Sequence, residues 1–138
     1  MTESINLTWV DNMAFEADVM GYKMMIDADP EFGGQYRGPK PKPLMLVALA
    51  GCTGMDLVSL LKKMRVEFDS LNVSVEGTTT DEHPKRFTRM IVIYRLKGMN
   101  IDKNKVEKAV ELSKEKYCGV AASYKASMDI DYRIEIME

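Results

Sequence analysis

Histidine and cysteine are scarce in this chain of 138 residues, which has one histidine, His83, and two cysteines, Cys52 and Cys118. The cysteines are 66 positions apart, so the chain offers no CxxC pair. Structural zinc sites need four ligands, drawn mostly from these two residue types and often in short-spaced pairs. We therefore expect no metal site, and we assign no role to His83, which lies in a polar stretch.

The chain also lacks the marks of secretion, membrane insertion and nucleic-acid binding. Residues 1–10 have no basic region followed by an apolar stretch, so we expect no signal peptide. The longest uncharged apolar run, residues 44–55, has 12 residues, which is too short to span a bilayer. With a formal charge of −2 there is no basic surface for nucleic acid. We expect a cytoplasmic protein, in which cysteines are more often catalytic or redox-sensing than structural.

The periodicity of apolar residues predicts an α+β fold. Alternation predicts three short strands before residue 30, a hairpin over residues 71–96 and a last strand over residues 128–136. Helical spacing predicts a helix over residues 43–66 and a second, capped by Asp102 and interrupted at Gly119, with a short piece through Tyr124. The order is βββ-α-ββ-α-β, and grouped strands favour mostly antiparallel sheets. We expect a single domain over residues 1–138.

Cys52 lies in the most apolar segment of the chain, between Gly51 and Gly54. Residues 44–64 read LMLVALAGCTGMDLVSLLKKM, a pattern that predicts a helix at the buried centre of the domain. Burial raises the pKa of a thiol, and Cys52 is about ten residues from the helix N-terminus, which gives it little help. A reactive Cys52 therefore needs a cation, and the candidates are Arg37, Lys40 and Lys42 in the preceding loop, or a residue of a second subunit. The alternative is a small core residue.

Asp56 and Cys118 are two further candidate site residues. Asp56 is four positions after Cys52, on the same helix face. As an anion it disfavours the Cys52 thiolate unless it orients the activating cation; structural pairing is the alternative. Cys118 ends the second helical pattern and opens the next short piece. A helix N-terminus lowers the pKa of a thiol; half-buried packing is the alternative there.

These residues together resemble the OsmC/Ohr family, named after osmotically inducible protein C and the organic hydroperoxide resistance proteins. The first matching segment is GPKP at residues 38–41 followed by LVALAGCT at residues 46–53. The second is YCGVAAS at residues 117–123. The order of elements and the regular last strand also fit, so the resemblance covers nearly the whole chain.

The resemblance implies an intertwined homodimer with thiol sites at the subunit interface, around a central buried helix. It implies thiol-dependent reduction of organic hydroperoxides or hydrogen peroxide. By position, Cys52 is the attacking cysteine, oxidised to a sulfenic acid, and Cys118 is the resolving cysteine that closes a disulfide. An external thiol, of the dihydrolipoyl type in the hydroperoxide branch, then reduces the disulfide. The resemblance implies no metal and no bound cofactor.

The chain departs from the best-studied branches of that family in two places. Those branches carry a Glu nine or ten positions before the cysteine, where this chain has Pro43 and Lys42. They also carry an Arg near the first turn, where this chain has Asp11 and Asn12. Arg37 is the only arginine before Cys52 and is the candidate substitute. The departures indicate a divergent OsmC-like branch.

Two other functions fit the same residues. The first is a redox sensor or small-ligand-binding protein, which predicts an apolar pocket near Leu49 and Met55. The second is a structural role in which both cysteines belong to the core and do not react.

Overall fold

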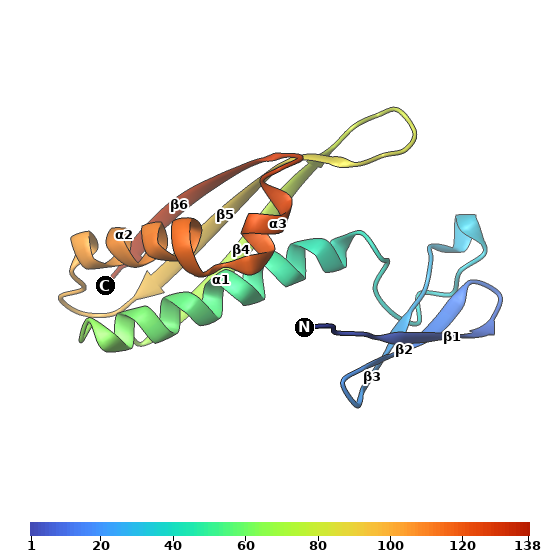
Figure 1. The fold of residues 1–138 in the computed structure, drawn as a ribbon, viewed down its shortest axis with the longest axis horizontal. Coiled ribbons are helices and arrows are strands. Elements are labelled where there is room, and N and C mark those ends of the chain that lie inside the picture. The colour runs from blue at the N-terminus through green and yellow to red at the C-terminus, as the bar shows by residue number, and fades with distance from the viewer. The chain divides into compact units, whose positions relative to one another are not determined.

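The computed structural model describes residues 1–138 and confirms the predicted order of elements (Figure 1). The strands are β1 (Asn6–Asp11), β2 (Ala14–Val19), β3 (Tyr22–Ile26), β4 (Ser70–Thr79), β5 (Phe87–Lys97) and β6 (Asp129–Met137). The helices are α1 (Pro43–Lys63), α2 (Lys103–Leu112) and α3 (Gly119–Tyr124), with a 3-10 turn η1 (Pro30–Phe32) and a π-helical turn η2 (Ser113–Tyr117). The predicted α+β class is therefore confirmed.

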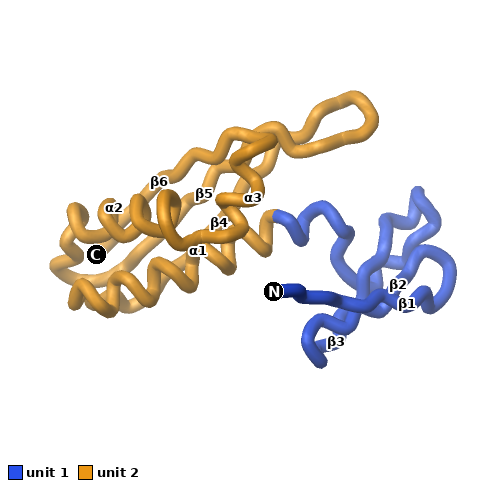
Figure 2. Tube along the Cα trace, viewed as in Figure 1, with its two compact units in different colours: residues 1–45 blue, residues 46–138 orange.

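The chain divides into two units, Met1–Met45 and Leu46–Glu138 (Figure 2). The first unit holds the predicted antiparallel meander, in the order β1-β2-β3. Few of its apolar side chains are buried: every residue of β1 is exposed, and Trp9 keeps 61% of its surface accessible. A small sheet with so little buried apolar surface needs a cover from elsewhere to be stable.

The second unit holds a sheet in the order β4-β5-β6. The β4–β5 pair is the predicted antiparallel hairpin, but β6 runs parallel to β5. The exception has a simple cause, because α2, η2 and α3 form a crossover between the two strands and return the chain in the original direction. Three of the four strand pairs in the molecule are antiparallel, as expected of mostly antiparallel sheets.

Helix α1 buries only one face in the single chain, whereas the sequence predicted a helix at the buried centre of the domain. The buried side chains are Leu49, Thr53, Leu57, Leu60 and Leu61. Val47 and Met55 are 63% and 76% exposed. By length and composition alone α1 is also apolar enough to cross a membrane, which the count of uncharged residues missed. The core helices of soluble proteins often have the same length and apolar composition, so these two properties alone do not indicate a membrane span.

Candidate functional site

The two cysteines meet in the second unit although 66 positions separate them. The Sγ atoms of Cys52 and Cys118 and a carboxylate oxygen of Asp56 all lie within 4.8 Å of one another. Cys52 is partly exposed on α1, whereas Cys118 is 3% exposed. Both thiols are free. The structure therefore brings together three of the four predicted site residues, and the fourth, Arg37, belongs to the first unit.

A π-helical turn places Cys118. The backbone N–H of Cys118 donates to the carbonyl oxygen of Ser113 at 2.8 Å, which closes η2 with a five-residue spacing. Cys118 then takes an extended conformation and caps α3, where its Sγ accepts a hydrogen bond from Ala121 N at 3.4 Å. Single π turns inside helical segments occur frequently at functional sites. The sequence predicted a break here at Gly119, one residue late.

Burial dominates the acidity of Cys118. Desolvation raises the pKa of this thiol to about 11, and the hydrogen bond from Ala121 N only partly opposes it. Interactions with the neighbouring Cys52 and Asp56 make smaller contributions in the same upward direction, and the pKa of about 11 includes them. The start of α3 lowers this pKa as expected, through the backbone N–H of Ala121, but the net shift is upward because loss of hydration outweighs one backbone N–H.

A chain of buried hydroxyls leads to Asp56. Ser113 Oγ donates to Asp56 Oδ2 at 2.8 Å, and Thr53 Oγ1 lies 3.0 Å from Ser113 Oγ and 2.5 Å from the hydroxyl of Tyr94. Each hydroxyl has one proton to give. Because Ser113 gives its proton to Asp56, Thr53 donates to Ser113, and Tyr94 donates to Thr53. Asp56 is thus held by structural pairing, and burial raises the pKa of Tyr94.

Sequence patterns did not predict the hydroxyl chain. Thr53, Tyr94 and Ser113 come from α1, β5 and η2, and each is fully buried. One feature of the sequence indicated a buried polar contact: Ser113 falls on the apolar face of the second predicted helix, where a polar side chain needs a hydrogen-bond partner. The identity of that partner depends on a contact across 57 positions, which no periodicity reveals.

Arg37 is engaged by carboxylates within the first unit. Its Nε donates to Asp27 Oδ2 at 3.2 Å, and its guanidinium forms a second ion pair with Asp11. The Asp27 side chain is fully buried and also accepts from the backbone N–H groups of Ala28, Gln35 and Arg37. These hydrogen bonds, that from Ala28 first, lower the pKa of Asp27. The role of Arg37 toward Cys52 remains a prediction.

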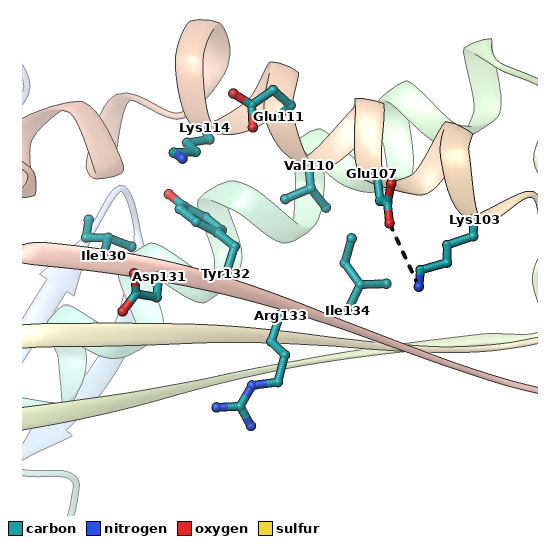
Figure 3. Close-up of a pocket in the computed structure, with 10 residues that line it drawn as sticks. All are labelled: Lys103, Glu107, Val110, Glu111, Lys114, Ile130, Asp131, Tyr132, Arg133 and Ile134. Carbon is teal, nitrogen blue, oxygen red and sulfur yellow. Dashed lines mark ion pairs between the residues drawn. The ribbon is translucent and has the colours of Figure 1, made fainter.

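Two of the hollows on the second unit lie near the candidate site. The first, about 540 Å³, runs between α2 and β6. Figure 3 shows Tyr132 and Ile134 directed toward the helix, with Lys114 beside the Tyr132 ring. The lining residues are Lys103, Glu107, Val110, Glu111, Lys114, Ile130, Asp131, Tyr132, Arg133 and Ile134. Tyr132 also stacks on Tyr94 with ring centroids 6.4 Å apart, so this wall adjoins the hydroxyl chain.

The second hollow, about 460 Å³, is shallow and apolar and lies between α1 and β4. Met55, Val58 and Val73 line it, together with Gly51 and Gly54. The apolar pocket expected near Met55 is therefore present. Leu49 is fully buried and does not line the hollow.

Comparison with known proteins establishes the family. The model of the OsmC-like protein family matches residues 33–133, so the chain belongs to that family. Protein YhfA from Escherichia coli K12 is 28% identical over 130 residues, which cover 94% of each chain. This distance agrees with the prediction of a divergent branch.

Solved structures agree with the fold. A hypothetical protein from Aquifex aeolicus superposes with a TM-score of 0.87 at 27% identity, over 100% of this chain and 98% of its own. An organic hydroperoxide resistance protein OsmC from Legionella pneumophila superposes with a TM-score of 0.69 at 16% identity, over 98% of this chain and 97% of its own. At that identity the second likeness shows the fold alone.

Proposed function

We propose that the protein is a thiol-dependent peroxidase in which Cys52 attacks and Cys118 resolves. The observation that carries the proposal is the approach of the two sulfur atoms to within 4.8 Å. Family membership and this close pair are compatible with a peroxidase, and the name of the Legionella pneumophila relative points to organic hydroperoxides as the substrate class.

Exposure assigns the two roles. Cys52 is partly exposed on α1, so a peroxide can approach its sulfur, whereas Cys118 is buried and its pKa is raised to about 11. The Cys52 thiolate attacks one peroxide oxygen, the O–O bond breaks, and the departing alkoxide takes a proton to leave as an alcohol. Cys52 becomes a sulfenic acid.

Cys118 completes the cycle. Its sulfur attacks the sulfenic sulfur of Cys52, the S–O bond breaks, and the hydroxyl leaves as water with the Cys118 proton. The product is a Cys52–Cys118 disulfide, whose sulfurs must approach to about 2.05 Å. An external dithiol, which we propose to be of the dihydrolipoyl type, reduces the disulfide by thiol–disulfide exchange and is itself oxidised.

A homodimer supports this activity. The first unit exposes large apolar side chains that a second copy of the chain can cover, among them Leu7 and Trp9 at 44% and 61% exposure. We propose that residues 1–138 act as one OsmC-like domain completed in an intertwined cytoplasmic dimer. Cys52 still needs a cation, and Arg37 is the proposed one, oriented by its carboxylate partners.

The test is a stoichiometric oxidation. Reduced protein receives one equivalent of an organic hydroperoxide, and free thiols and intact mass are followed. We expect rapid loss of two thiols and two mass units per chain. Cys118→Ser should react once and stop at the sulfenic acid, and Cys52→Ser should not react. Undiminished peroxide consumption by Cys52→Ser would exclude the proposal, and Ser59→Ala, an exposed change on the same helix, is the control.

A redox-sensing or ligand-binding protein is the second candidate. Two observations favour it: the apolar hollow beside Met55, and the Asp56 carboxylate within 4.8 Å of both sulfur atoms, where an anion disfavours a reactive thiolate. This function predicts oxidation over minutes without repeated turnover. Fast turnover with any peroxide and a dithiol would exclude it.

A further inference from the structure

We propose that Cys52, Asp56 and Cys118 bind one Zn²⁺ ion in the reduced protein, so that metal and disulfide exclude each other. The binding site stands on the geometry of the three side chains. Its consequence, inhibition of peroxide reduction by Zn²⁺, rests on the proposed function. The expectation of no metal site considered histidines and short-spaced cysteines, and it did not include donors that the fold collects.

The donor atoms are nearly in place. Tetrahedral Zn²⁺ with Zn–S bonds of about 2.3 Å holds two sulfurs about 3.8 Å apart. The three donors of this site already lie within 4.8 Å of one another. A contraction of about 1 Å therefore forms a site with three protein ligands, and the fourth position is left to a water molecule.

Neighbouring groups orient two of the donors. Ser113 Oγ holds one oxygen of Asp56, which leaves the other oxygen of that carboxylate available. Ala121 N donates to the sulfur of Cys118 at 3.4 Å, as it would to a thiolate. Hydrogen bonds from outside the ligand set fix the orientation of metal ligands and raise affinity.

Charge also favours a cation here. Two sulfurs and a carboxylate gather around one point, and Cys118 is 3% exposed, so water screens the ionised groups poorly. Binding releases a proton from each thiol, and two thiolates and one carboxylate then coordinate the ion. The sulfurs bonded to the metal are no longer free to attack a peroxide or each other.

Direct binding measurements test the site without relying on peroxidase activity. Reduced protein is titrated with Co²⁺, and Zn²⁺ affinity is measured by competition with a chromophoric chelator. We expect one ion per chain and a sulfur-to-cobalt charge-transfer band that is lost in Cys52→Ser and in Cys118→Ser. Asp56→Asn, which still accepts the Ser113 hydrogen bond, should weaken Zn²⁺ binding at least tenfold.

The control is Asp81→Asn, which removes the same charge from the exposed β4–β5 loop and should leave affinity unchanged. Protein carrying the Cys52–Cys118 disulfide should not bind. A missing charge-transfer band, or full affinity in Cys118→Ser or Asp56→Asn protein that melts like the parent, overturns the site. A protein that binds Zn²⁺ but shows no peroxide turnover even after the metal has been removed by a chelator would instead reject the proposed function and leave the metal site standing.

Discussion

At the scale of single residues, the two cysteines differ because their surroundings differ. Cys52 is partly exposed on α1, while Cys118 is buried between η2 and α3. Sequence patterns placed both at helical positions and offered no means of ranking their exposure. In the proposed peroxidase, this difference in burial decides which sulfur meets the peroxide first.

Alkylation rates should separate the two thiols. The thiolate reacts with iodoacetamide, and a pKa raised from 9.0 to about 11 lowers the thiolate fraction of Cys118 at neutral pH by about a hundredfold. In native protein with a chelator present, we expect Cys52 to label first and Cys118 to label fast only as the pH approaches 11. Peptide mass spectrometry over time measures both. Equal labelling rates of Cys118 in the native and the urea-unfolded protein would contradict the prediction. If Cys52 never labels in the native protein, the structural role of the cysteines is favoured.

At the scale of elements, sequence patterns predicted the strands and helix ends that interactions between neighbouring residues determine. Alternation of apolar residues located the strands, and Asp102 caps α2 by accepting from Lys105 N, as expected. The π turn was not predictable, because helical spacing continues through residues 113–117 and the five-residue closure depends on packing. The hydroxyl chain was also beyond reach, because Ser113 and Asp56 meet across 57 positions. Of the candidate site, Cys52, Asp56 and Cys118 were thus predictable, and the buried hydroxyls that support them were not.

The segment after β3 should be sensitive to acid. Asp27 is a buried carboxylate whose pKa is lowered by hydrogen bonds from Ala28, Arg37 and Gln35. A lowered pKa stabilises the fold above the unfolded value of about 3.9, and this contribution is lost as the pH falls through the folded pKa. We expect stability to urea to fall steeply with acid below about pH 4 and to depend less on pH in Asp27→Asn.

Trp9 is the only tryptophan and lies in the first unit, so its fluorescence reports this transition. Asp29→Asn provides the comparison, since that carboxylate is partly exposed and pairs with Lys40 at 3.2 Å. The same acid dependence in Asp27→Asn and the parent protein would show that another carboxylate governs the transition.

At the scale of the whole molecule, the exposed apolar surface calls for a partner. In the single chain the first unit leaves Leu7, Trp9 and Phe15 uncovered, and α1 leaves Val47 and Met55 uncovered. Soluble monomers rarely expose large contiguous apolar surfaces. In the homodimer that we propose, a second copy of the chain covers both faces, since each copy offers the same two uncovered faces.

If the protein is a homodimer, its molecular mass in solution and the solvent accessibility of Trp9 should change together. Sedimentation of the wild-type protein should give twice the chain mass of 15.6 kDa, and acrylamide should quench Trp9 weakly because the partner covers it. Leu7→Glu introduces a charge into that covered face and should give a monomer with strongly quenched fluorescence and several-fold slower oxidation of Cys52. Thr8→Glu adds the same charge on the opposite face of β1 and should remain dimeric. A wild-type monomer with accessible Trp9 would reject the dimer, and a Leu7→Glu monomer that oxidises at the wild-type rate would show that each chain carries a complete thiol site.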